Sequence, residues 1–84
     1  MRNTAQILVF ISFLFINACS VYKKAEKKFE KGEFNSAINL YKQAVKKNDN
    51  AAQALFKTAE SYRLSNRLEI SAPFYEAAID SGYR

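Results

Sequence analysis

Residues 37–45 read AINLYKQAV, and residues 71–79 read SAPFYEAAI. The two stretches lie 34 positions apart, and each carries a small residue, a tyrosine and an alanine in the same order. The matched pairs are Ala37 with Ser71, Tyr41 with Tyr75, Ala44 with Ala78 and Val45 with Ile79, and upstream Val21 with Leu55, Ala25 with Ala59, Gly32 with Asn66 and Phe34 with Leu68. A match of this kind at a fixed period predicts one supersecondary unit copied in tandem.

Within each copy the apolar residues recur every three or four positions, which is the period of an α-helix. In the first copy Val21, Ala25 and Phe29 share one side of a helix, while lysines at 23, 24, 27, 28 and 31 take the other side. Gly32 and Asn66 are the residue types that best tolerate positive φ at a helix end. Asn48-Asp49-Asn50 is typical of a turn and of helix caps. The sequence therefore predicts two helix hairpins.

Pro73 leaves the start of the fourth helix open between two interpretations. Proline is harmless in the first turn of a helix but costs about 3 kcal/mol in its interior. The helix could therefore begin near Ser71-Ala72, with Ser71 as its N-cap. The other interpretation is a kinked helix that begins at Leu68.

The period and the small-residue pattern resemble the tetratricopeptide repeat, TPR. Small residues at Ala25, Ala37 and Ala44, and again at Ala59, Ser71 and Ala78, match the family's positions, although Asp49 and Gly82 stand where it usually has proline. The resemblance implies an all-α fold of antiparallel hairpins stacked as an α-solenoid. It places the domain at 19–84, with repeats at about 18–51 and 52–84.

In the TPR family the first helix of each repeat lines a concave groove. Carried onto this chain, the resemblance implies a partner groove made of Tyr22, Glu26, Phe29, Phe56, Glu60 and Arg63. Such a strip of aromatic and charged side chains suits a protein or peptide partner. The alternative is that Phe29 and Phe56 belong to the core, because aromatic residues at helical spacing usually pack inside.

Residues 1–18 have the features of a targeting segment. A short polar start with one charge, Arg2, precedes the apolar run 7–16, which is too short to span a membrane. The run ends in Ala18-Cys19, which resembles the lipobox of bacterial lipoproteins. That resemblance implies cleavage after residue 18 and a lipid on Cys19, which would attach the protein to the membrane. The alternatives are an uncleaved anchor, a plain signal peptide or an idle cysteine.

The lysines at 23, 24, 27, 28 and 31 follow directly after this cysteine. A basic patch beside an acyl anchor strengthens attachment to an anionic membrane. The alternative is an ordinary solvated helix face with Glu26 and Glu30 as neighbours. Residues 20–24 lack the acidic run that resembles a surface-export signal, so we expect an outer-membrane lipoprotein that faces the periplasm.

Composition excludes several functions. The 84 residues contain no histidine and a single cysteine, so this chain alone offers no zinc, haem or iron–sulfur site and no Ser-His or Cys-His pair. We expect no catalytic residues, cofactor or metal, and no nucleic-acid partner, because a groove-reading motif is missing.

These observations predict a non-catalytic scaffold in the cell envelope. The stretch 59–67, AESYRLSNR, resembles the front of large Bacteroidetes envelope lipoproteins, of the type IX secretion and gliding type or of the peptidoglycan-associated type. Two hairpins are thin for a solenoid, so we expect either the front of a longer protein or a small protein that docks on a partner. The alternative is the N-terminal TPR part of a larger envelope protein or enzyme, such as a cell-wall-binding or secretion component.

Overall fold

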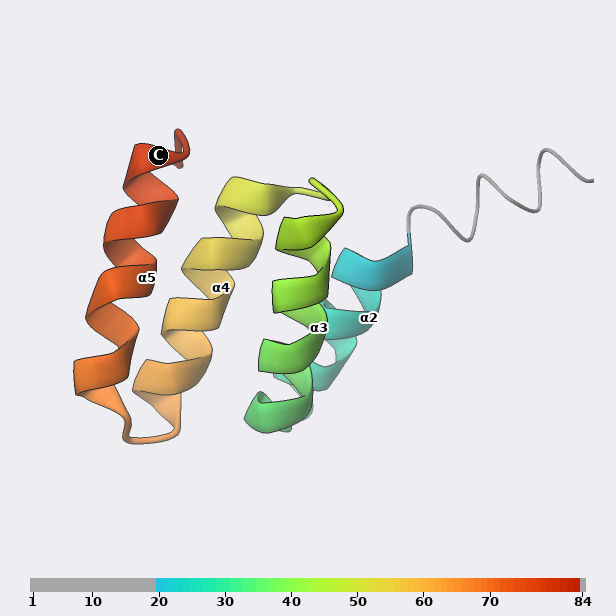
Figure 1. Ribbon diagram of the computed structural model, residues 1–84. Coiled ribbons are helices and arrows are strands. Elements are labelled where there is room, and N and C mark those ends of the chain that lie inside the picture. Colours follow the sequence, from blue (N-terminus) through green and yellow to red (C-terminus); the bar gives the residue numbers. More distant parts are fainter. Residues whose placement is uncertain (1–19, 84) are drawn as a thin grey trace, which may run out of the picture.

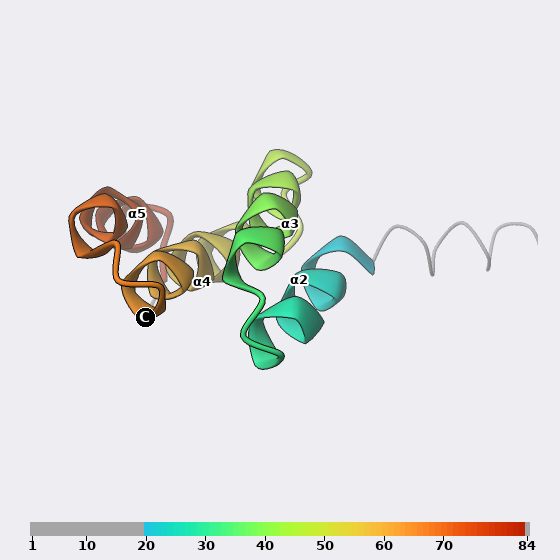
Figure 2. The same ribbon diagram turned by 90° about the horizontal axis from the view of Figure 1, so that it is seen from below.

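The computed structural model describes residues 20–83 and forms them into helices, with no strand in this range. The helices are α2 (Ser20–Glu30), α3 (Phe34–Lys46), α4 (Ala51–Leu64) and α5 (Leu68–Asp80). Each helix packs against the next one along the chain (Figure 1). Seen from below, they form a row with α2 and α5 at its two ends (Figure 2). The predicted all-α fold of helix hairpins is confirmed. The expected signal peptide at 1–18 and Cys19 lie outside the described residues.

Each of the four described helices is followed by a residue with positive φ. These residues are Gly32, Asn48, Asn66 and Gly82, with φ of 77°, 54°, 63° and 97°. At the end of α2 the Gly32 N–H donates to the Phe29 carbonyl at 2.9 Å, and the next N–H, of Glu33, donates to the Lys28 carbonyl at 2.9 Å. This pair of bonds is the Schellman motif, and it recurs after α3, α4 and α5. The helix ends predicted at Gly32 and Asn66 are confirmed.

The start of α5 settles the question that Pro73 raised. Of the two interpretations, the start at Leu68 is confirmed and the start near Ser71-Ala72 is wrong, so Pro73 lies inside the helix. The Ser71 hydroxyl is not an N-cap; it donates to the Leu68 carbonyl at 2.6 Å. Proline has no N–H to offer the carbonyl of Glu69, but Glu69 and Pro73 are both exposed, and water can bond that carbonyl.

Small residues form the places where neighbouring helices meet. Ala25 of α2, Ala37 and Ala44 of α3 and Ala54 of α4 all have no exposed surface and belong to one core cluster. Tyr41 fills the space beside them and is itself fully buried. Alanine keeps the helix axes close, and the tyrosine ring occupies the volume that the alanines leave.

The turn between α3 and α4 also fixes the start of α2. The Asp49 carboxylate accepts a hydrogen bond of 3.1 Å from the backbone N–H of Tyr22, in the first turn of α2. A negative charge is favourable at a helix N-terminus. The expected capping cluster thus caps α2, whereas Asn50, at the start of α4, makes no side-chain cap bond.

We expect Gly32→Ala to destabilise the fold by about 1 kcal/mol. A left-handed backbone costs an L-residue about 1–2 kcal/mol. Alanine also has less conformational freedom than glycine in the unfolded chain, and this offsets part of the cost. A Cβ at Gly32 would meet no atom within 4 Å, so the cost is conformational. Thermal unfolding followed by circular dichroism should show a Tm about 4–8 °C lower. Lys31→Ala, at the exposed neighbouring residue, is the control and should change stability by less than about 0.5 kcal/mol. Equal losses in both variants would contradict the argument.

Candidate functional site

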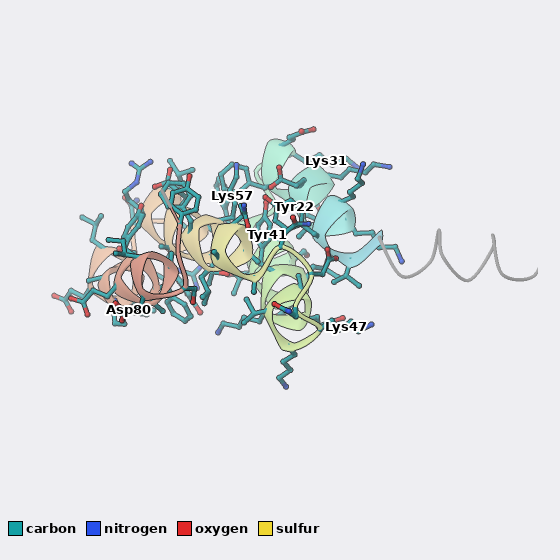
Figure 3. All side chains as sticks on the ribbon, turned by 90° about the horizontal axis from the view of Figure 1, so that it is seen from above. Tyr22, Lys31, Tyr41, Lys47, Lys57 and Asp80 are labelled. Atoms are coloured by element: carbon teal, nitrogen blue, oxygen red, sulfur yellow. The ribbon has the colours of Figure 1, made fainter. Side chains whose placement is uncertain are left out.

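The residues expected to line the groove lie on α2 and α4, whose side chains meet at Lys57, Glu26 and Phe29. Figure 3 shows Tyr22, Tyr41 and Lys57 gathered between α2, α3 and α4, while Lys31, Lys47 and Asp80 lie at the outside. All six residues expected to line the groove lie on α2 or α4, and five of them are half-buried while Arg63 is exposed. The two helices therefore present one mixed surface of rings and charges.

The same pair of contacts recurs in both hairpins. The Tyr41 hydroxyl donates a hydrogen bond to the Glu26 carboxylate, and the Tyr75 hydroxyl donates to Glu60, exactly one period later in the chain. The Tyr41 ring also meets the Tyr22 ring edge to face at 5.7 Å. Its counterpart, Tyr75, meets the ring of Phe56 at 5.6 Å in the same geometry. Each groove carboxylate is thus held by a tyrosine of the following helix.

A lysine of α4 completes the first hairpin's cluster. The Lys57 ammonium lies 3.8 Å from a Glu26 oxygen and 4.2 Å from the centre of the Phe29 ring. Both partners are on α2, so this lysine of α4 links the two hairpins. An ammonium over an aromatic face contributes about 0.5–1 kcal/mol at an exposed site.

In the second hairpin the cation beside the glutamate is Arg63, which lies on α4, the same helix as Glu60. The Arg63 guanidinium donates two hydrogen bonds to the Glu60 carboxylate, at 2.9 and 3.1 Å, and one to the Tyr75 hydroxyl at 3.2 Å. Arg63 stands one period after Phe29, so a cation replaces the ring to which Lys57 binds. The bonds from Arg63 lower the pKa of Glu60, and the Tyr75 hydroxyl adds to the effect.

The tyrosines in these clusters resist ionisation. Burial raises the pKa of Tyr41 well above its ordinary value, and the hydrogen bond to Glu26 raises it further. Burial also raises the pKa of Tyr75, with a smaller contribution from Glu60. Both hydroxyls therefore stay protonated as donors, and neither serves as a base near neutral pH.

The structure gives each expected groove residue a specific neighbour. Phe29 contacts Phe34 and Tyr41 at 5.5 and 6.4 Å, and Phe56 stacks on Tyr83 at 4.3 Å. Both rings are half-buried and pack against other aromatic rings, so each contributes to the packing of its hairpin while part of its surface stays exposed. The expected strip omits the two tyrosines that bond the carboxylates. The sequence does contain a pattern that marks them, because a tyrosine follows a glutamate by 15 residues in both copies.

The described residues contain neither a metal cluster nor a membrane span. Within residues 20–83 no three His, Cys, Asp or Glu side chains converge as ligands for a metal ion. None of the four helices described has the length and apolar character that crossing a bilayer requires. A shallow hollow lies at the turn into α5, lined by residues 66–70.

Comparison with protein-family models, with curated proteins and with solved structures gives no match for this chain.

The raised pKa of Tyr41 predicts a loss of stability in alkali. In the unfolded chain Tyr41 ionises near its ordinary pKa of about 10, whereas in the folded chain it stays protonated. The stabilisation is complete below about pH 10 and decreases above it by at most about 1.4 kcal/mol per pH unit, because the unfolded state then binds fewer protons. Urea unfolding between about pH 9 and 11.5 should show a flatter pH dependence for Tyr41→Phe. Tyr62→Phe leaves the Tyr41–Glu26 bond in place and is the control; the same flattening in both variants would contradict the assignment.

Proposed function

We propose that this chain is a membrane-anchored lipoprotein of the bacterial cell envelope that acts as a non-catalytic scaffold for a protein partner. The observation that carries the proposal is the place of Cys19, between the apolar run 7–16 and Ser20, the first residue of α2. A lipid on Cys19 would hold the helical domain directly at the membrane surface. The resemblance to TPR lipoproteins supports an outer-membrane location that faces the periplasm.

The surface of α2 and α4 supports binding of a protein or peptide in the groove. Tyr22, Phe29 and Phe56 leave part of their rings open between charged side chains, and aromatic anchors carry much of the energy of protein interfaces. The charges are already held in place by Lys57 and Arg63. A groove that is ordered before binding loses little side-chain entropy when a partner arrives.

The same contacts argue against acid–base chemistry in this groove. A carboxyl is an efficient general acid or base at neutral pH when its pKa is raised towards 7. Arg63 instead lowers the pKa of Glu60. Glu26 accepts a bond from Tyr41 and pairs with Lys57. These carboxylates position helices, which is what a scaffold requires.

A second proposal is that these hairpins form the N-terminal TPR part of a larger envelope protein, such as a cell-wall-binding or secretion component. The observation that favours it is the apolar surface at the far end of the row, where Leu68 and Ile79 of α5 are 63% and 67% exposed. Further protein packed there would cover these side chains.

Expression of the intact gene in a bacterium with lipoprotein processing should yield a mature chain that starts at Cys19 and carries acyl groups, because two or three chains give stable anchoring. Mass spectrometry of the membrane fraction reads both features. Cys19→Ser should lose the acyl mass and leave the membrane fraction. A mature terminus elsewhere, with a free thiol, would contradict the lipoprotein proposal.

A photo-crosslinking amino acid at position 56 should capture an envelope protein that the same amino acid at position 46 does not. Phe56 lies in the groove, whereas Lys46 is exposed at the end of α3. The adduct is identified by mass spectrometry in intact cells. Capture of the same proteins from both positions, or from neither, would count against the groove as the binding surface.

A further inference from the structure

The side of α2 that is turned away from the core is basic. At helical spacing it gathers lysines, which are Lys23, Lys24, Lys27, Lys28 and Lys31. Lys28 is half-buried and the other four are exposed, and we call this surface the lysine face. Val21 and Ala25 are buried on the other side of the helix. Residues 32–83 carry as many carboxylates as cations, so the positive excess of the described chain lies in α2 and Lys31.

The glutamates of α2 do not neutralise the lysine face. Glu26 is engaged with the neighbouring helices, because it accepts a hydrogen bond from Tyr41 and lies 3.8 Å from the Lys57 ammonium. Glu30 is exposed at the border of the lysine face, and it makes no ion pair within residues 20–83. The contacts therefore do not support the interpretation in which Glu26 and Glu30 balance the lysines of their own helix.

The lysines instead repel one another. Like charges four residues apart destabilise a helix, and the pairs at this spacing are Lys23 with Lys27, Lys24 with Lys28 and Lys27 with Lys31. The first turn of α2 carries no acidic residue to favour the positive end of the helix dipole. Among the described residues the lysine face has a single ion pair, between Lys28 and Glu33 at 3.7 Å. An anionic surface placed against this face would relieve the repulsion.

This chain itself offers no suitable anionic surface. Residues 1–18 contain neither aspartate nor glutamate, so that segment has no carboxylate for the lysine face. Helix α5 of a second copy would bring exposed carboxylates, but Leu68 and Ile79 of the same helix are 63% and 67% exposed. Packing ammonium groups against apolar side chains is unfavourable.

A phospholipid surface suits the lysine face better, because its phosphates attract ammonium groups that stay in contact with water. The face begins four residues after Cys19, the residue that the proposed function attaches to the membrane. A helix rises about 1.5 Å per residue, so Lys24 and Lys31 lie about 10 Å apart along the axis. Charges farther than about 8 Å from the phosphates are largely screened in physiological salt. All the lysines therefore act together only if α2 lies along the membrane.

We propose that the lysine face of α2 binds the anionic phospholipid headgroups of the membrane, with α2 lying along the surface. The inference rests on the proposed attachment at Cys19 and adds a second, electrostatic contact with the same membrane. Because α2 stands at one end of the row, this contact leaves α4 and α5 accessible to a protein partner (Figure 2).

Vesicle flotation of the full chain with Cys19→Ser tests the proposal without a lipid on residue 19. One set of vesicles contains phosphatidylcholine alone, and the other contains equal parts of phosphatidylcholine and phosphatidylglycerol. The apolar run 7–16 is present in both samples, so the comparison isolates the effect of lipid charge. We expect the partition coefficient to be about tenfold or more higher on the anionic vesicles, with a difference that salt reduces. Equal partition to both vesicles overturns the proposal.

Charge reversal locates the contact. Lys24→Glu combined with Lys27→Glu should lower the partition to anionic vesicles by about tenfold or more. Lys46→Glu combined with Lys47→Glu is the matched control, because both lysines are exposed and the change in net charge is the same. Figure 3 shows Lys31 and Lys47 on opposite sides of the row, so the control should change the partition by about twofold or less. Equal losses would mean that only net charge matters, which overturns the proposal.

A gain of binding cannot come from unfolding. Glu30→Lys extends the lysine face and should raise the partition to anionic vesicles by about fivefold or more, whereas Glu76→Lys, at an exposed site on α5, should leave it nearly unchanged. Lys24→Glu and Lys31→Glu, made singly, should weaken binding to a similar extent. Loss in Lys24→Glu alone would mean that α2 stands upright on the membrane, and equal gains at Glu30 and Glu76 would mean that binding is not confined to α2. Either result overturns the proposal.

Analytical ultracentrifugation tests the second copy as the occupant. A dimer that Lys24→Glu combined with Lys27→Glu abolishes would mean that the lysine face binds another chain, and the proposal would be wrong. The vesicle experiment contains no acylated cysteine, so its failure leaves the lipoprotein proposal standing. An unacylated Cys19 in the mature protein would contradict the lipoprotein proposal and leave the vesicle result unchanged. The two proposals can therefore fail separately.

Discussion

The close approach of neighbouring helices at alanine is the constraint on which the rest of the structure depends. Ala25, Ala37, Ala44 and Ala54 have no exposed surface, so the backbones of α2, α3 and α4 meet with almost no side-chain volume between them. Because the helix axes are so close, the Tyr41 hydroxyl reaches Glu26 and the Lys57 ammonium reaches the Phe29 ring. A larger residue at any of these alanines would move the helices apart, because a close-packed interior has no spare volume. The contacts between the side chains of α2 and α4 therefore depend on the core beneath them.

In each hairpin a half-buried glutamate is paired with a cation, but the cation comes from a different place. In each of them a glutamate accepts a hydrogen bond from a tyrosine and needs a positive neighbour in a half-buried place. The first hairpin takes Lys57 from the next repeat, and this couples the hairpins to each other. The second takes Arg63 from its own helix, so its glutamate is satisfied locally. Since removal of one partner from such a pair leaves a charge poorly compensated, both cations are structural as well as surface residues.

Much of the fold could be predicted from the sequence because it follows from local rules. The alanine spacing indicated which helix sides meet, and Gly32 and Asn66 marked helix ends because few other residues adopt positive φ. The start of α5 could not be decided locally, since propensity places Pro73 in a first turn. The helix nevertheless begins at Leu68, and the Glu69 carbonyl that Pro73 leaves free lies in an exposed part of the helix, where water can bond it. Asp49 likewise caps α2 rather than α4, which depends on how the turn folds back in three dimensions.

The candidate site was predictable as a set of helix positions but not as a set of bonds. Helical spacing placed Tyr22, Glu26 and Phe29 together, whereas the role of Tyr41 depends on how the second helix crosses the first. The helices at the two ends of the row, α2 and α5, differ from their counterparts α4 and α3 in charge and exposure. Lysines stand on α2 at positions where α4 carries buried small residues, so a helix could not cover α2 as α3 covers α4 without burying charge. At the other end α5 keeps apolar residues at the covered positions of α3 and adds only carboxylates beside them. The two ends of the described row therefore differ in chemistry: a helix packed on α2 would bury ammonium groups, whereas a helix packed on α5 would bury apolar side chains.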